Sequence, residues 1–261
     1  MGSNSYSAEA PQLRDAASVV LIRDGSADLE VFTLTRSPTM ASFPNATVFP
    51  GGGVDPGDVL DDSAWDGTDL SLWAKTFDDD EFNVRRLLVA AVRETFEECG
   101  VLLAQGLDSS SLSPQDYAAA RSALENRELD MGEFLAAHDL KVDFSLLRPL
   151  ARWVTPEGNP RRYDTRFFLA QLPAGQNAVR TTGEATLAQW MSPEMAFSLF
   201  REGKTHLMPP TWSMFRTLSG FASAADALSA EFEPRQVTPT IARSEPPQRI
   251  DFPYAEEYYA P

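Results

Sequence analysis

The segment RETFEE, residues 93–98, contains three glutamates whose spacing could support chemistry. Glu94, Glu97 and Glu98 stand at positions i, i+3 and i+4, so a helix would carry them on one face. Like charges at this spacing repel, and Arg93, which can pair with Glu97, cannot neutralise three carboxylates alone. Carboxylates without histidine or thiolate ligands favour Mg²⁺ or Mn²⁺, shared with substrate phosphates. The alternative is a solvated helix face with an ordinary ion pair.

A run of glycines, Gly51 to Gly53, precedes this segment by about forty residues. Glycine permits a close approach of the backbone to a ligand, so a main-chain carbonyl here could reach a metal held by the glutamates. A nucleotide-binding P-loop is the competing interpretation, and it fails because no Gly-Lys-Ser or Gly-Lys-Thr follows. The glycines and the carboxylates are therefore candidates for one site.

The elements that must position these residues follow one another in a mixed order. Prolines and caps begin helices at Ser113-Pro114 and Ser192-Pro193, and Asp24-Gly25 is typical of a hairpin turn. The expected strands are AASVVLIRDGS, LEVFTLTRS, ATVFPGGG, LARWVTP, RRYDTRFFLAQLP and LAQWM, and the expected helices begin near Asn83, cover 113 to about 139, follow Ser192 and include PPTWSMFRTLSGF. This order favours an α+β sandwich with a mixed β-sheet over a doubly wound fold.

Three regions are expected along the chain: a flexible lead over residues 1–13, a domain over 14–225 and a Pro-rich tail over 226–261. The prolines of the tail exclude a long helix, but Phe252 and its neighbouring tyrosines are not typical of a free linker. The tail is therefore expected to pack on its own domain or, alternatively, to dock on a second subunit and form a homodimer.

Composition limits the function classes. The chain has 261 residues, 43% of them apolar, and 38 acidic against 22 basic residues. The resulting negative field argues against nucleic-acid and membrane partners, so an anionic substrate needs local cations. A single cysteine, Cys99, and two histidines exclude a disulfide framework and argue against structural zinc. With no apolar run of bilayer length and no secretion signal, we expect a cytoplasmic protein.

Gly52, Asp58 and RETFEECGV together resemble the box of the Nudix hydrolase family, G-x5-E-x7-R-E-U-x-E-E-x-G-U, where U is bulky and apolar. Asp58 stands where the family has glutamate, and residues 59–92 replace the usual seven-residue spacer. A long insertion at this place is similar to that of coenzyme A diphosphohydrolases in the family. The resemblance implies a Nudix-like α/β/α sandwich with helical insertions, here 59–87 and 108–148, and an extended C-terminal tail. We expect the first insertion to be a surface excursion anchored by Trp65, Leu72, Trp73 and Phe77, with Gly52 still beside the box helix.

The resemblance also implies roles for the box residues. Glu97 and Glu98 would be the principal ligands of Mg²⁺ or Mn²⁺, and Glu94 a further ligand or the group that orients the attacking water. Gly52 would supply a backbone carbonyl ligand, and Arg93 would hold the carboxylates by charge-assisted hydrogen bonds. The implied reaction is hydrolysis of a diphosphate in a small-molecule nucleoside diphosphate derivative.

Residues outside the box are further candidates. Glu184, just before the strand LAQWM, is placed like the additional acid of many Nudix enzymes, and its alternative is a turn glutamate in water. Arg161 and Arg162 follow Gly158 and Pro160 in a loop, where guanidinium groups could clamp a phosphate, although alternation points at most one of them inward. The acidic cluster from Asp78 to Glu81 is expected to cap and flank the box helix, with an auxiliary metal site as the alternative.

The substrate is expected to be coenzyme A or an acyl-coenzyme A. Arg36-Ser37 aligns with the family's coenzyme A segment, but Ala41 replaces its second arginine and Asn45 its glycine. A nucleotide sugar or a dinucleotide is the alternative substrate. A module that binds a nucleotide without cleaving it is the alternative function, kept open by Asp58 and the long insertion.

Overall fold

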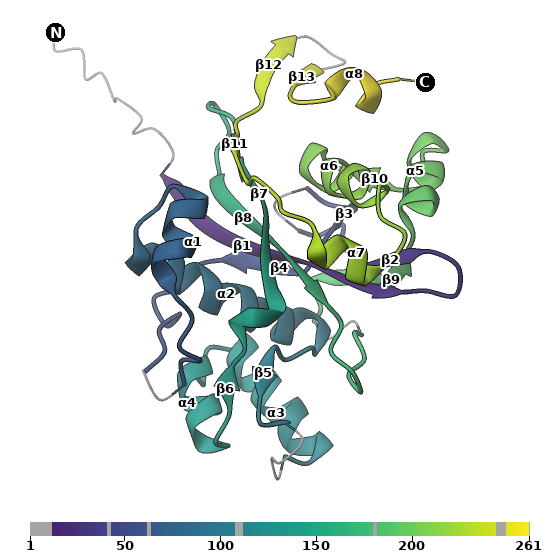
Figure 1. The fold of residues 1–261 in the computed structure, drawn as a ribbon. Helices are drawn as coiled ribbons and strands as arrows, with labels where there is room; N and C mark the ends of the chain where they lie inside the picture. Colours follow the sequence, from purple (N-terminus) through teal and green to yellow (C-terminus); the bar gives the residue numbers. More distant parts are fainter. Residues whose placement is uncertain are drawn as a thin grey trace, which may run out of the picture.

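The computed structural model describes residues 12–40, 43–61, 64–107, 112–179, 182–243 and 249–260. Its largest sheet has the strand order β10-β3-β2-β1-β8-β7-β11, with β4 paired to β1 and β9 paired to β2 (Figure 1). These strands are β1 (Leu13–Asp24), β2 (Leu29–Arg36), β3 (Ala46–Val48), β4 (Gly51–Gly53), β7 (Leu147–Val154), β8 (Arg162–Gln171), β9 (Ala185–Met191), β10 (His206–Leu207) and β11 (Gln236–Val237). β1 runs parallel to β8 and antiparallel to β2, so the sheet is mixed as expected.

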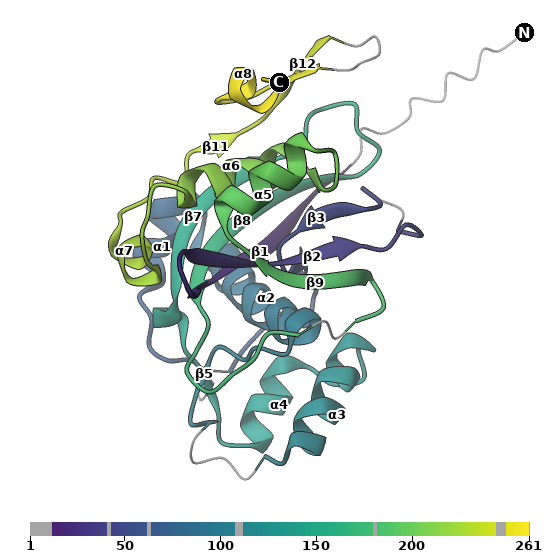
Figure 2. The same ribbon diagram turned by 90° about the vertical axis from the view of Figure 1, so that its right-hand side faces the viewer.

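Helices cover both faces of this sheet (Figure 1, Figure 2). α1 (Leu70–Phe77) and α2 (Glu81–Cys99) lie on one face, and α5 (Pro193–Arg201), α6 (Pro209–Leu218) and α7 (Ala224–Ser229) lie on the other. Side chains alternate along β1, so Val19 packs into the core under α2 and Val20 into the core under α6. The expected α+β sandwich is confirmed.

The box helix α2 has defined ends. The side chain of Asp80 accepts a hydrogen bond from the backbone N–H of Asn83 at 2.8 Å, as an N-cap does, and Gly100 ends the helix with φ 71°. The helix therefore begins two residues before Asn83, and the acidic cluster caps it as expected. Its apolar face is fully buried: Leu88, Val92 and Phe96 have no exposed surface.

The segment 59–87 is part of the core and not only a surface excursion. Phe77 and Trp73 pack on Phe168 of β8 at ring distances of 5.5 and 5.8 Å, and Trp65 packs on Phe144 at 4.6 Å. Leu72, also expected as an anchor, is 64% exposed because it lies on the outer face of α1. That part of the expectation was wrong.

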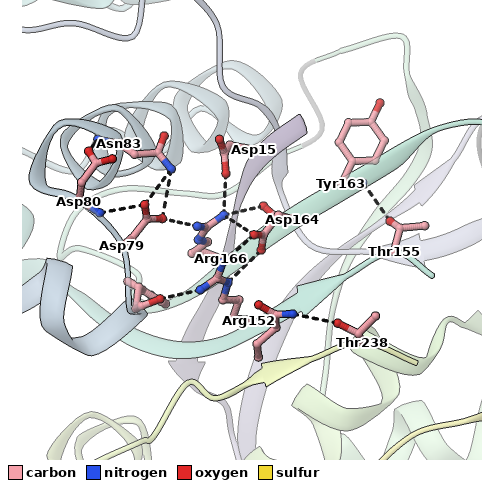
Figure 3. Close-up of polar contacts among 12 residues, drawn as sticks. Asp15, Asp79, Asp80, Asn83, Arg152, Thr155, Tyr163, Asp164, Arg166 and Thr238 are labelled. Atoms are coloured by element: carbon pink, nitrogen blue, oxygen red, sulfur yellow. Dashed lines mark hydrogen bonds and ion pairs between the residues drawn. The ribbon is translucent and has the colours of Figure 1, made fainter. Parts of the chain in front are cut away.

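A buried polar network also ties this segment to the sheet (Figure 3). Arg166 of β8, 2% exposed, donates to Asp15 of β1 at 2.7 Å and to Asp79 before α2. Arg152 of β7 donates from Nε and Nη2 to both oxygens of Asp164, at 3.1 and 2.8 Å, and from Nη1 to the carbonyl of Phe77. Charge-assisted hydrogen bonds of this kind offset the cost of removing these arginines and aspartates from water. The insertion is therefore held to the sheet by apolar packing and by ion pairs.

The second insertion, expected to be helical over 113 to about 139, contains the two helices α3 and α4. The elements in and around this insertion are β5 (Ala104–Gln105), α3 (Pro114–Glu125), α4 (Met131–Ala137), β6 (Lys141–Val142) and the 3₁₀ turn Phe144–Leu146. The capping box of Ser113 with Asp116 begins α3, and the left-handed residue Arg127, φ 58°, separates α3 from α4. Both helices lie beyond α2, on the side away from the sheet (Figure 1, Figure 2).

The C-terminal tail packs on its own chain. β11 pairs in parallel with β7, and β12 (Thr240–Arg243) pairs with β13 (Arg249–Asp251) before α8 (Ala255–Tyr258). Phe252 packs on Trp153 of β7 at 5.8 Å, and the Tyr258 hydroxyl donates to the carbonyl of Leu207 at 2.9 Å. Residues 1–11 of the lead expected over 1–13 lie outside the described residues, as do Ala41, residues 62–63 and 108–111 of the insertions, and residues 244–248 of the tail.

Candidate active site

The three box glutamates line a cleft of about 850 Å³. They lie on the C-terminal half of α2, where the helix passes the edge of the sheet formed by β4. Glu97 is only 8% exposed, and Glu94 and Glu98 are partly buried. The face predicted from their spacing therefore exists and faces a cavity instead of open water.

The glycine run lies directly against these glutamates. β4 pairs antiparallel with β1, with Gly52 opposite Ala17, and the backbone N–H of Gly51 donates to Oε2 of Glu98 at 2.8 Å. A Cβ built on Gly52 would lie 2.6 Å from Cδ of Glu94, so only glycine leaves room for that carboxylate. The expectation that the insertion leaves Gly52 beside the box helix is confirmed.

Arg93 holds several acidic groups at once. Its Nε and Nη2 donate to the two oxygens of Asp58 at 2.7 and 3.1 Å, and its Nη1 donates to Glu94 at 2.8 Å and Glu97 at 3.4 Å. Nη2 also donates to the carbonyl of Gly53 at 3.0 Å. Asp58 is fully buried, so it orders Arg93 and is not itself exposed to the cleft.

The electrostatics of the cluster are unfavourable without a further cation. Burial, opposed by the charge of Arg93 and reinforced by that of Glu97, raises the pKa of Glu94 to about 7. Burial also raises the pKa of Glu97 and, with the charge of Glu94, raises the pKa of Glu98 well above its usual range. The single positive charge of Arg93 therefore does not neutralise the negative charges of the three glutamates, as expected from the sequence.

Oxygen donors of this kind fit a hard divalent cation. Among the residues that the structure describes, no three His, Cys, Asp or Glu side chains are already arranged as a metal site. Glu98 accepts from Gly51, and Glu94 and Glu97 accept from Arg93. Each of these hydrogen bonds uses one carboxylate oxygen, so the second oxygen of each glutamate can act as a donor to a cation.

Residues from other elements complete the cleft wall. Glu184, on the loop before β9, lines the cleft, and its charge contributes to the raised pKa of Glu98 after burial and Glu94. Arg36 lines the cleft at the end of β2 and opposes that rise. The backbone N–H of Ser37 donates to the carbonyl of Glu184 at 2.7 Å, which fixes the loop against β2. The structure thus brings Arg36 and Glu184 to the box glutamates.

The two loop arginines separate as the alternation indicated. Arg161 lines the main cleft beside Asn159 and Tyr163. Arg162 lines a second depression together with Arg152 and Asp164, and its Nε donates to the carbonyl of Thr155 at 3.1 Å. The geometry therefore supports Arg161 as a cleft residue and does not place Arg162 there.

Sequence reasoning missed two contributions to the cleft. Arg127, between α3 and α4, lines it and pairs with Asp55 at 3.0 Å, while Pro239, Ile241 and Ile250 bring the C-terminal tail to its far end. Neither segment carries a motif, and both reach the cleft only through contacts between residues that are far apart in the sequence. Cys99 is buried and its thiol donates to the carbonyl of Thr95, so it belongs to the packing of α2 and not to the cleft.

A family model described as "NUDT19 Nudix domain" matches residues 75–218. Over 150 residues the chain is 32% identical to human "Acyl-coenzyme A diphosphatase NUDT19", covering 53% of this chain and 40% of that protein. It is 29% identical over 197 residues to "Putative nudix hydrolase 7" of Caenorhabditis elegans, covering 76% of this chain and 57% of that protein. The chain thus spans about half the length of these relatives.

The fold is also similar to a solved structure, the NUDIX hydrolase from Alicyclobacillus acidocaldarius. The TM-score is 0.70 at 28% identity, and the similarity covers 86% of this chain and 99% of that one. In the described part of the chain, no helix combines the length and hydrophobicity of a bilayer span. From the match to the family model and the assembled box, we conclude that this chain belongs to the family of the NUDT19 Nudix domain.

Proposed function

We propose that this chain hydrolyses the diphosphate bond of a nucleoside diphosphate derivative, with coenzyme A or an acyl-coenzyme A as the first choice of substrate. The observation that carries the proposal is the meeting of Glu94, Glu97 and Glu98 with Gly52 in one large cleft. A structural helix face would have no need of a glycine whose missing side chain makes room for a carboxylate. The retained carboxylates also argue against a module that only binds a nucleotide.

Glu97 and Glu98, with Glu94 and the carbonyl of Gly52, are proposed to hold Mg²⁺ or Mn²⁺. When bound, such a cation lowers the pKa of a bound water and neutralises charge on the phosphoryl oxygens. Arg93 orders these ligands because Asp58 fixes one side of its guanidinium while Nη1 donates to the glutamates.

Glu184 is proposed to take the proton of the attacking water. It lies in the same cleft as the box helix but on a different element, so it can face the reacting phosphate from the other side. The water oxygen forms a bond to phosphorus, the bond from phosphorus to the bridging oxygen breaks, and the leaving phosphate carries away the electron pair. Accepting this proton requires a carboxylate at this position.

Arg36 and Arg161 are proposed to bind the remaining phosphates. The net charge of −16 repels an anionic substrate at a distance, so these cations in the cleft must compensate locally. Arg162, which lies outside this cleft, has no place in this proposal.

Coenzyme A is preferred because two observations agree on it. A matched relative is named an acyl-coenzyme A diphosphatase. The cleft is also larger than a diphosphate needs and has apolar lining residues such as Phe49 and Phe167.

The experiment is a substrate panel with products identified by mass. Coenzyme A, its thioesters, dinucleotides and nucleotide sugars are each incubated with the protein and Mg²⁺ or Mn²⁺. We expect 3′,5′-ADP and phosphopantetheine from coenzyme A, with no products in the presence of EDTA. Cleavage of dinucleotides or nucleotide sugars alone would show that these, and not coenzyme A, are the substrates. Cleavage of no compound would favour a module that binds a nucleotide without cleaving it.

A further inference from the structure

The main cleft has two chemically different ends. The box glutamates and Arg36 form a charged end on α2 and β2, whereas Trp153, Phe167 and Met208, the N-cap of α6, form an apolar end. Trp153 and Phe167 belong to the core cluster on that face of the sheet, yet both reach the cleft. A substrate whose diphosphate lies at the charged end would therefore present another part of itself to apolar side chains.

The C-terminal tail supplies the outer wall of this apolar end. Pro239, Ile241 and Ile250 line the cleft, and Ile241 stands directly opposite Ile250 across the β12–β13 pair. Directly paired residues place their side chains on the same face of a hairpin, so the two isoleucines form one apolar surface. Ile241 is 47% exposed, so a hydrocarbon chain lying against it would remove apolar surface from water.

The tail is fixed in this position by several independent contacts. Arg216 of α6 donates from Nε and Nη2 to the two oxygens of Glu257, at 2.7 and 2.9 Å, and lies 3.6 Å from the ring centre of Tyr254. Tyr258 packs on Trp212 at 5.7 Å. Together with the pairing of β11 and β7, these contacts hold the segment from β12 to α8 on the α6 side of the sheet (Figure 1). The wall is thus part of the folded domain.

The tail lies beyond residue 218, where the match to the family model ends. Its contribution to the cleft is therefore a feature of this chain that the box does not imply. We infer that Ile241 and Ile250 of the tail, with Trp153 and Phe167, bind the hydrocarbon part of the substrate and set its preferred chain length. This inference rests on the proposed function, because it places the diphosphate of the same substrate at the glutamates.

The test compares two thioesters of coenzyme A that differ only in their chain, acetyl-coenzyme A and octanoyl-coenzyme A. For the wild type we expect a higher kcat/KM and a lower Kd for the octanoyl ester. Ile241→Ser and Ile250→Ser should each lower the octanoyl-to-acetyl ratio of kcat/KM about fivefold or more, the scale on which an apolar pocket distinguishes chain length. Leu72→Ser, an exposed leucine on α1 away from the cleft, is the matched control and should leave the ratio unchanged.

The outcomes separate this inference from the proposed function. If both esters are cleaved but neither tail variant changes their ratio, the hydrolase stands and the chain site is wrong. An equal loss for both esters also overturns the inference, because the tail would then contact a part that they share. Calorimetric Kd values do not need turnover: a chain-length preference lost in Ile241→Ser supports the site even in a protein that cleaves neither ester. Binding of neither ester contradicts it.

Discussion

A methyl group on Gly52 would lie 2.6 Å from Cδ of Glu94, closer than two such atoms can approach. The conflict is with the end of a flexible side chain, so Glu94 would move and the backbone would stay. We therefore expect Gly52→Ala to lower kcat by about tenfold or more, because a displaced catalytic group loses that much. The melting temperature should change by only a few degrees, on the order expected for about 1 kcal/mol.

Gly53→Ala is the matched control for this change. A Cβ at Gly53 meets only the carbonyl oxygen of Asp15, at 4.0 Å, which is an ordinary contact. We expect it to affect kcat much less than Gly52→Ala does. Equal kcat values for the two variants would show that the contact between Gly52 and Glu94 has no role in turnover.

Asp58→Asn tests whether this aspartate supports the site through Arg93. Asp58 is fully buried and accepts both hydrogen bonds of one side of that guanidinium. Removing its charge leaves a buried arginine without its main partner, so the free energy of unfolding should fall by about 3–5 kcal/mol. Asp55→Asn, which affects the exposed pair with Arg127, should cost less than about 1 kcal/mol in urea denaturation. A loss that small for Asp58→Asn would refute the positioning role.

The box helix could be predicted because its signal is local. Carboxylates at i, i+3 and i+4 and an acidic cap suffice to fix the face of α2 and its start to within two residues. Adjacency in the sequence also indicated that Arg161 and Arg162 would not both point inward, and only Arg161 lines the main cleft.

Features that depend on distant packing could not be predicted in this way. Leu72 and Phe77 are both apolar residues of one short helix, yet only Phe77 is buried, because β8 meets that side of α1. The burial of Asp58 depends on Arg93, which is far along the chain. The position of the tail residues Ile241 and Ile250 in the cleft depends on the pairing of β11 with β7. A strand of two residues is too short to be predicted from its sequence pattern.

Glu184→Gln tests the proposed base. Glu184 faces the cleft from the loop before β9, and the amide of glutamine cannot accept the proton of water. We expect kcat to fall by about 100-fold, the usual scale for a lost general base, with little change in melting temperature. Glu233→Gln, on the exposed part of the tail, is a control that should leave kcat unchanged. A kcat within about threefold of the wild type in Glu184→Gln, under roughly 1 kcal/mol, would assign Glu184 to a solvated turn.

Arg166→Met tests the network that ties the first insertion to the sheet (Figure 3). Methionine keeps much of the volume, but Asp15, Asp79 and Asp164 would lose the cation between them. We expect the free energy of unfolding to fall by about 3 kcal/mol or more. Arg23→Met, which removes a half-exposed pair with Glu30, should cost less than about 1 kcal/mol. Similar losses in both variants would mean that packing alone holds the insertion.

The most direct test of the proposed chemistry is the steady-state kcat of Glu98→Gln with coenzyme A and saturating Mg²⁺. This substitution keeps the shape of the side chain and removes the charge that lies beside the glycine run. If Glu98 holds the metal, kcat should fall on the order of 100-fold or more, because the charge stabilisation of the transition state is lost. An unchanged melting temperature would show that the fold is intact in this variant. A kcat equal to that of the wild type would contradict the proposal that the box helix carries the metal site.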